Sequence, residues 1–146
     1  MSNIIKKPNA VFWILGVVFL LWNGLGGCGI YLMDKFTSDA DLLKLNGQAM
    51  LDARHAYPVW ATAAYAIAVW GGLVASILYL MRKQVAVTLF VVSLIAAIIC
   101  FIPTFTNTTV KAGDGDSYWV MPVIVVLLGM LEIWWSHKQK AQGFLN

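Results

Sequence analysis

The chain has 146 residues, of which 60 % are hydrophobic and 12 % are charged, and its formal net charge is +3. Its mean hydropathy of +0.76 leaves too little polar surface for a soluble domain of this size. The composition therefore predicts a single integral membrane domain over residues 1–146, in contact with a lipid bilayer. A nucleic-acid partner is not indicated, because no run of basic residues is longer than two.

The first apolar stretch, residues 10–33, contains no charged residue and can cross a hydrocarbon layer about 30 Å thick. Two lysines precede it, as in a signal peptide, but the stretch is too long for that role and we expect a retained membrane helix. Gly16, Asn23 and Gly27 fall on one face of this helix. Small residues and an amide on one face indicate close packing against another helix.

A polar and mostly acidic segment follows, over residues 34–57. Within it, Ser38 and Asp41 have the spacing of a helix capping box, at the start of an amphipathic run. We expect a short helix on the membrane surface, broken near Asn46 and Gly47.

A second spanning helix is predicted over residues 58–81, beginning at Pro58, a residue favoured in the first turn. Small residues recur along it at helical spacing: Ala61, Ala64, Ala68, Gly71 and Ala75. We expect this stripe to pack against the glycine and asparagine face of the first helix.

Two more spanning helices complete the prediction, over residues 85–102 and 118–136. The connection at residues 82–84 is short, which predicts an antiparallel helical hairpin. Pro103 is expected to end the third helix, and the turn-rich segment that follows is expected to be a loop. The predicted fold is an all-α, four-transmembrane-helix antiparallel bundle with a short amphipathic surface helix between the first and second spans.

The basic residues predict the orientation of this bundle. If the N-terminus is cytoplasmic, the inside segments carry six basic residues and no acid: Lys6, Lys7, Arg82, Lys83, Lys138 and Lys140. The positive-inside rule then places both termini in the cytoplasm. For a bacterial chain, the expected location is the inner membrane.

Several segments carry a resemblance to a known family. These are Leu21-Trp22-Asn23 with Gly26, the run 60–69 (WATAAYAIAV) with Gly71-Gly72, the Arg82-Lys83 turn, and the tail with Gly143-Phe144-Leu145. Over most of its length the chain resembles small bacterial inner-membrane proteins that carry the general label of sugar transporters. The resemblance implies a four-helix membrane fold and transport, and it assigns no catalytic or binding residue.

Glu132 is the one Asp, Glu, Lys, Arg or His residue that falls inside a predicted span. It lies about five residues from the cytoplasmic end of the fourth helix as predicted. Intramembrane acids are costly and usually functional, so Glu132 is a candidate for proton coupling or cation binding. The alternative is a shallow carboxylate that reaches the membrane surface or pairs with Arg82 or Lys83. Ser76 is expected at about the same level.

Asn23, Trp22 and Trp70 are candidates for binding a solute. Asn23 could bond to a sugar hydroxyl while Trp22 or Trp70 stacks on the ring; the alternative, which we favour, is an amide that holds two helices together. Cys28 and Cys100 have no metal-ligand spacing, and free thiols are favoured over a disulfide. We expect neither a metal nor a cofactor, and the absence of a hydrolase or phosphate-loop motif argues against an enzyme.

Two functions are compatible with these features. The first is an accessory or self-associating subunit in the membrane, with a membrane-protein partner or further copies of itself. The second is a small-solute transporter of the sugar type that works as a homo-oligomer, for which Glu132 is the candidate residue for proton coupling. Few polar residues at mid-membrane depth and no mid-helix proline favour the first function.

Overall fold

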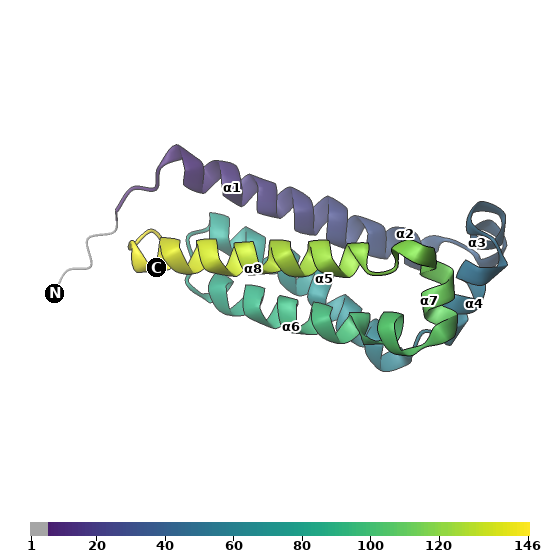
Figure 1. Ribbon diagram of the computed structural model, residues 1–146. Helices are drawn as coiled ribbons and strands as arrows, with labels where there is room; N and C mark the ends of the chain where they lie inside the picture. The colour runs from purple at the N-terminus through teal and green to yellow at the C-terminus, as the bar shows by residue number, and fades with distance from the viewer. Residues whose placement is uncertain (1–5) are drawn as a thin grey trace.

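A computed structural model describes residues 6–146, and its spanning part is a bundle of long helices (Figure 1). Four helical stretches are long and apolar enough to cross a membrane. They are the continuous stretch α1 (Ala10–Leu21), η1 (Trp22–Gly29) and α2 (Ile30–Phe36), then α5 (Val59–Leu80), α6 (Val85–Thr106) and α8 (Val120–Ala141). The predicted all-α membrane fold is confirmed.

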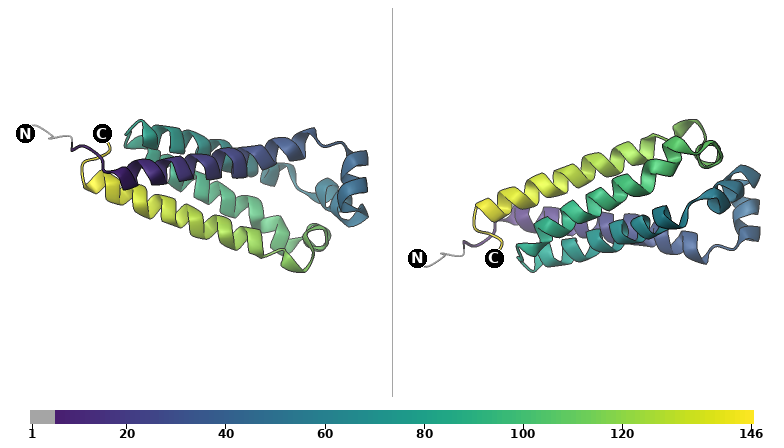
Figure 2. Two further views of the ribbon diagram at one scale, coloured as in Figure 1. Left: turned by 90° about the horizontal axis from the view of Figure 1, so that it is seen from above. Right: turned by 90° about the horizontal axis from the view of Figure 1, so that it is seen from below.

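The four spans pack in a series. The helices α5 and α6 form the most extensive contact, α1 and η1 lie against α5, and α8 lies against α6. Both views in Figure 2 show α1 and α8 close together where α1 begins and α8 ends, and farther apart toward the other end. The first and last spans are therefore the two outer members of the series.

One end of the bundle gathers the start of α1, the α5–α6 turn and the C-terminal segment (Figure 1). Arg82 adopts a left-handed conformation with φ of 62°, and its carbonyl accepts the Asn146 N–H at 2.7 Å. Its guanidinium donates to the carbonyls of Lys6 and Phe144, each at 2.9 Å. Leu145 is only 3 % exposed, so the tail folds back into the core.

The opposite end carries three short helices: α3 (Asp39–Asn46), α4 (Gln48–Ala56) and α7 (Thr108–Asp114). Ser38 caps α3 by accepting the Asp41 N–H at 3.2 Å, as predicted. The break between α3 and α4 falls at Gly47, whose φ of 85° favours glycine. A helix at the predicted place is therefore confirmed, divided into α3 and α4 at the predicted break.

Several predicted boundaries are wrong. The first span continues to Phe36 rather than to residue 33 and is π-helical in its middle, and the last runs to Ala141 rather than to residue 136. The third span continues through Pro103 to Thr106. The proline ring removes only one backbone hydrogen bond of the helix. The next turn closes normally, since the Asn107 N–H donates to the Pro103 carbonyl at 2.8 Å. A helix, α7, lies in the predicted loop.

The expected seam between the first two spans is only partly right. In the first span, Gly16 faces Tyr79 and Gly27 faces Val69 of α5, as a packing role requires. On α5, however, Ala68 packs with Ala96 and Ala97 of α6, and Gly71 lies beside Ser93. Of the five small residues in the stripe, Ala61, Ala64, Ala68 and Ala75 are buried and Gly71 is half-buried, so the stripe is a packing surface that α6 shares with the first span.

The aromatic core lies nearer the end where α1 begins. Phe12 stacks on Tyr79 with ring centroids 4.5 Å apart, and both side chains are fully buried. The Trp135 indole N–H donates to the Tyr79 hydroxyl at 2.9 Å, which ties α8 to α5. Phe19 and Phe90 complete the cluster, edge to face at 6.0 Å. The polar group described next lies beside this cluster, farther from the end where α1 begins.

Candidate functional site: a buried carboxyl and amide

Glu132 lies deep inside the bundle. Its side chain belongs to the middle of α8, nine residues before Ala141, and the residue is 5 % exposed. At a rise of 1.5 Å per residue, this places it about 14 Å from the end of the helix. The predicted distance of about five residues from the end of the helix is too short, because α8 continues through Lys138 and Lys140 to Ala141.

The partner of Glu132 is Asn23. The Asn23 side-chain Nδ2 donates to Glu132 Oε1 at 2.6 Å, and it also lies 3.1 Å from Ser76 Oγ and 2.9 Å from the Phe19 carbonyl. The alternative pairing of Glu132 with Arg82 or Lys83 is not among the ion pairs of residues 6–146, and Arg82 instead donates to the carbonyls of Lys6 and Phe144. The expected level of Ser76 is correct, and one polar group therefore joins the first span, α5 and α8.

The three acceptors around Asn23 exceed the protons that the amide can offer. A side-chain amide carries two N–H groups, whereas Phe19, Ser76 and Glu132 each present an oxygen to Nδ2. Ser76 uses its own proton on the Gly72 carbonyl at 2.8 Å. At least one N–H is consequently shared, and the carboxyl of Glu132 competes with backbone and hydroxyl oxygens for it.

A small cavity adjoins this group. Its volume is about 30 Å³, and Trp22, Asn23, Ser93, Gly129 and Glu132 are among the residues that line it. One water needs roughly 10–15 Å³ by this measure, so the cavity has room for about two waters. It does not fit a sugar. Ser93 donates to the Ala68 carbonyl at 2.7 Å, which fixes its hydroxyl on the cavity wall.

The π-helical segment η1 positions Asn23. The segment Trp22–Gly29 holds four glycines and follows a regular α-helical stretch. A π-helix bonds residue i to residue i+5, and such segments are frequent at functional sites. The glycines allow close contact: Gly27 lies beside Val69, and the Trp22 ring covers Gly26. Glycine-rich sequence indicated packing here, but it did not indicate a π-helix.

Other candidate residues lie apart from the cluster. Trp70 is 44 % exposed and is not among the residues that line the cavity, so the structure does not bring it together with Asn23 and Trp22 there. Cys28 and Cys100 are free, as favoured, and their thiols donate to the carbonyls of Val69 and Ala97. Within residues 6–146, no three His, Cys, Asp or Glu side chains come together as a metal site would require.

Two residues of the site were missed by sequence reasoning. Gly72 supports Asn23 from α5, since a Cβ at this position would overlap the Asn23 side chain. Ser93 lines the cavity, although no motif in the sequence identifies it. The Gly71-Gly72 pair was a signal for close approach, but spacing alone could not tell which glycine faces which helix.

Comparisons with protein-family models, with curated proteins and with solved structures found no match to this chain. The geometry of the buried cluster is therefore the basis for a functional proposal.

Proposed function

We propose that this multi-pass membrane protein is a small proton-coupled transporter in which Glu132 takes up and releases the proton. The observation that carries the proposal is the buried contact between Glu132 of α8 and Asn23 of the π-helical segment η1. Transporters place their coupling sites near the middle of the membrane, where helices are interrupted. We place the coupling site at the level of the irregular segment η1, where the polar groups come from Asn23, Ser76, Ser93 and Glu132.

The environment of Glu132 suits a change of protonation. In the part of the chain that the structure describes, the ion pairs involve Arg54 and His55, and none involves Glu132. An unpaired carboxylate inside a membrane protein is costly, which is why intramembrane acids usually serve a function. The hydrogen bond to its side chain comes from the neutral amide of Asn23, so a proton gained or lost changes the charge of the core by one.

This change of charge can act on the position of the first span. An N–H bond to an ionised carboxylate is about twice as strong as a bond to a neutral acceptor. Loss of the proton would therefore strengthen the contact from Asn23, and gain of the proton would weaken it. Because α1 and α8 are the outer members of the helix series, this contact is placed to control their separation.

The size of the cavity indicates that a solute needs a different conformation or a second copy. About 30 Å³ holds water but no larger polar molecule, so the observed conformation is closed to a solute. We propose a homo-oligomer that carries a small polar solute, and the family resemblance makes sugars the first class to test. The basic residues near the α5–α6 turn and the chain ends support an inner-membrane orientation with this end in the cytoplasm.

The test is uptake into proteoliposomes that contain a pH-sensitive dye and face a panel of sugars and other small polar solutes. Wild type is expected to take up one solute together with protons. In Glu132→Gln, the rate of proton-coupled uptake is expected to fall at least about tenfold. Asp116→Asn, which removes an exposed acid elsewhere, is the matched control and should keep the wild-type rate. Equal proton-coupled uptake by Glu132→Gln would overturn the role of Glu132.

A second candidate function is an accessory or self-associating membrane subunit. The observation that favours it is that the most apolar 18-residue window of α8 has the smallest buried share among the four spans, 17 %. An exposed face of this kind contacts either lipid or another membrane protein. Native mass spectrometry of complexes extracted from membranes distinguishes the two functions: a stable hetero-complex, with no uptake of any solute by the purified protein, supports the subunit.

A further inference from the structure

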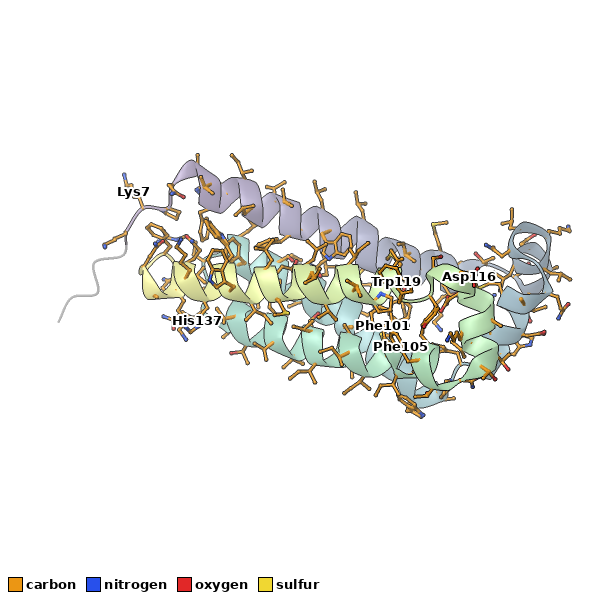
Figure 3. All side chains as sticks on the ribbon, viewed as in Figure 1. Lys7, Phe101, Phe105, Asp116, Trp119 and His137 are labelled. Atoms are coloured by element: carbon orange, nitrogen blue, oxygen red, sulfur yellow. The ribbon has the colours of Figure 1, made fainter. Side chains whose placement is uncertain are left out.

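A second and larger cavity lies at the end of the bundle that carries α7. Its volume is about 170 Å³, and it is formed where α6 ends, α7 turns back and α8 begins. Figure 3 labels Phe101, Phe105, Asp116 and Trp119 at this end, and Lys7 and His137 at the other. It shares no lining residue with the small cavity beside Glu132.

The walls of this cavity combine one acid with aromatic and apolar groups. Asp114 supplies a carboxylate, and a hydrogen bond links it to the buried Thr104 side chain. Phe101 and Tyr118 supply aromatic walls, and Met121 supplies an apolar one. The ring of Tyr118 is held in place by Phe105, edge to face at 5.6 Å. Such a combination suits a ligand with a charged head and an apolar body.

The charge of Asp114 has no partner in the described residues 6–146, where no ion pair includes it. Burial raises the pKa of Asp114 above its usual value, and the hydrogen bond from Thr104 only partly opposes this shift. Asp114 is nonetheless an exposed residue, so its carboxylate is open to solvent as well as to the cavity. A cation bound in the cavity would be the ion-pair partner of this carboxylate.

The aromatic wall already attracts an ammonium group. Lys111 places its Nζ 4.2 Å from the centroid of the Tyr118 ring. An ammonium over an aromatic face gains about 0.5–2 kcal/mol, depending on how far it is desolvated. One face of the Tyr118 ring is thus already covered by the chain's own ammonium group, and the ring remains an apolar wall for the rest of a ligand.

We propose that this cavity binds a small organic ammonium ion, whose charged nitrogen bonds to Asp114 and whose apolar part lies against Phe101 and Tyr118. The volume suits this class of ligand, since a cavity of about 150 Å³ is sufficient for one benzene molecule. The site is independent of Glu132 and goes beyond the proposed transport. An amine site here and a proton site at Glu132 can each exist without the other.

Binding of benzylammonium to the full chain in lipid nanodiscs, measured by calorimetry, tests this proposal. Benzyl alcohol is the matched probe, because it has nearly the same size and no charge; protein-free nanodiscs correct for partition into lipid. Wild type is expected to bind benzylammonium saturably and about tenfold or more tightly than benzyl alcohol, as a hydrogen-bonded charge requires. Equal affinity for the two probes, or no saturable binding of benzylammonium, would overturn the proposal.

Two aspartates on the same segment provide the matched variants. Asp114→Asn removes the carboxylate of the cavity and is expected to abolish the preference for the charged probe. Asp116→Asn removes an exposed acid that does not line the cavity, and it is expected to change the affinity by less than about twofold. Equal losses in both variants would show that only the general negative charge attracts the amine, and the site would be refuted. The comparison of the two probes on wild type decides the question even if Asp114→Asn does not fold.

Discussion

Asn23 and Gly72 lie against each other across the contact between η1 and α5, so closely that a methyl group on Gly72 would overlap the Asn23 side-chain oxygen. The same methyl group would lie 3.1 Å from Ser93 Oγ. Gly72 therefore leaves room for the side-chain oxygen of Asn23, while the nitrogen of the same amide donates to Glu132. The absence of a side chain at residue 72 is what allows the amide to reach the carboxyl of α8.

Gly72→Ala is expected to destabilise the bundle by about 1–3 kcal/mol, because the new methyl group displaces Asn23. The measurement is the free energy of unfolding by SDS in mixed micelles. Gly71→Ala is the matched control, since its methyl group would meet Ser93 Cβ at an ordinary distance of 3.6 Å. We expect little change in that variant. A cost for Gly71→Ala equal to that of Gly72→Ala would contradict the assignment of Gly72 as the support of Asn23.

Asn23 and Glu132 are expected to be energetically coupled. Asn23→Leu leaves the carboxyl without its donor and should cost about 1–3 kcal/mol, whereas Asn23→Leu combined with Glu132→Met should recover much of this loss. A double-mutant cycle on the free energy of unfolding measures the coupling, which we expect at about 0.5–3 kcal/mol. The pair Asn23 and Trp70, which do not line a common cavity, is the control. Additive effects of Asn23 and Glu132 would show that their contact contributes nothing.

Asp114 makes the stability depend on pH. Because burial raises its pKa in the folded chain, the folded state holds this proton more tightly than the unfolded state. Stability relative to Asp114→Asn should therefore be highest at low pH and should fall as the pH rises through the usual aspartate value of about 3.9 toward the raised one. Thermal unfolding of both proteins from about pH 3 to about pH 7 gives the difference. A difference that grows more favourable to wild type with rising pH has the opposite sign and would contradict the prediction.

Gly47 is needed for the break between α3 and α4. Its φ of 85° and ψ of 178° form a conformation that is essentially restricted to glycine, so Gly47→Ala should cost about 1–3 kcal/mol locally. Faster amide hydrogen exchange in α3 and α4 is the expected result, with α5 and α6 unchanged. Gly24→Ala is the control, because its methyl group would meet Leu73 at 3.6 Å and its backbone needs no positive φ. Unaltered exchange in Gly47→Ala would show that the break tolerates a side chain.

The spans were predictable because each is a long apolar run, and the Ser38 cap and the Gly47 break follow local rules that need no tertiary information. The ends of helices depended on more. Pro103 does not end α6, since the turn after it closes on the proline carbonyl. Lys138 and Lys140 continue α8 as a regular helix, which moves Glu132 away from its end.

The site was only half predictable for a related reason. Spacing placed Asn23 on a packed face and identified Glu132 as the acid within a span. It could not show that these two residues meet, because the contact joins positions 109 residues apart through the order in which four helices pack. It also could not separate Trp22, which lines the cavity, from Trp70, which faces outward.

The series α1–α5–α6–α8 has a consequence for how the protein is made. Spanning helices enter the bilayer first and associate afterwards. During synthesis Asn23 reaches the membrane before Glu132 has been translated, and it can meanwhile bond to Phe19 within its own helix and to Ser76 of α5. The bond to Glu132 forms only when α8 has also been inserted. The polar cluster thus closes last, and its completion coincides with the arrival of every helix.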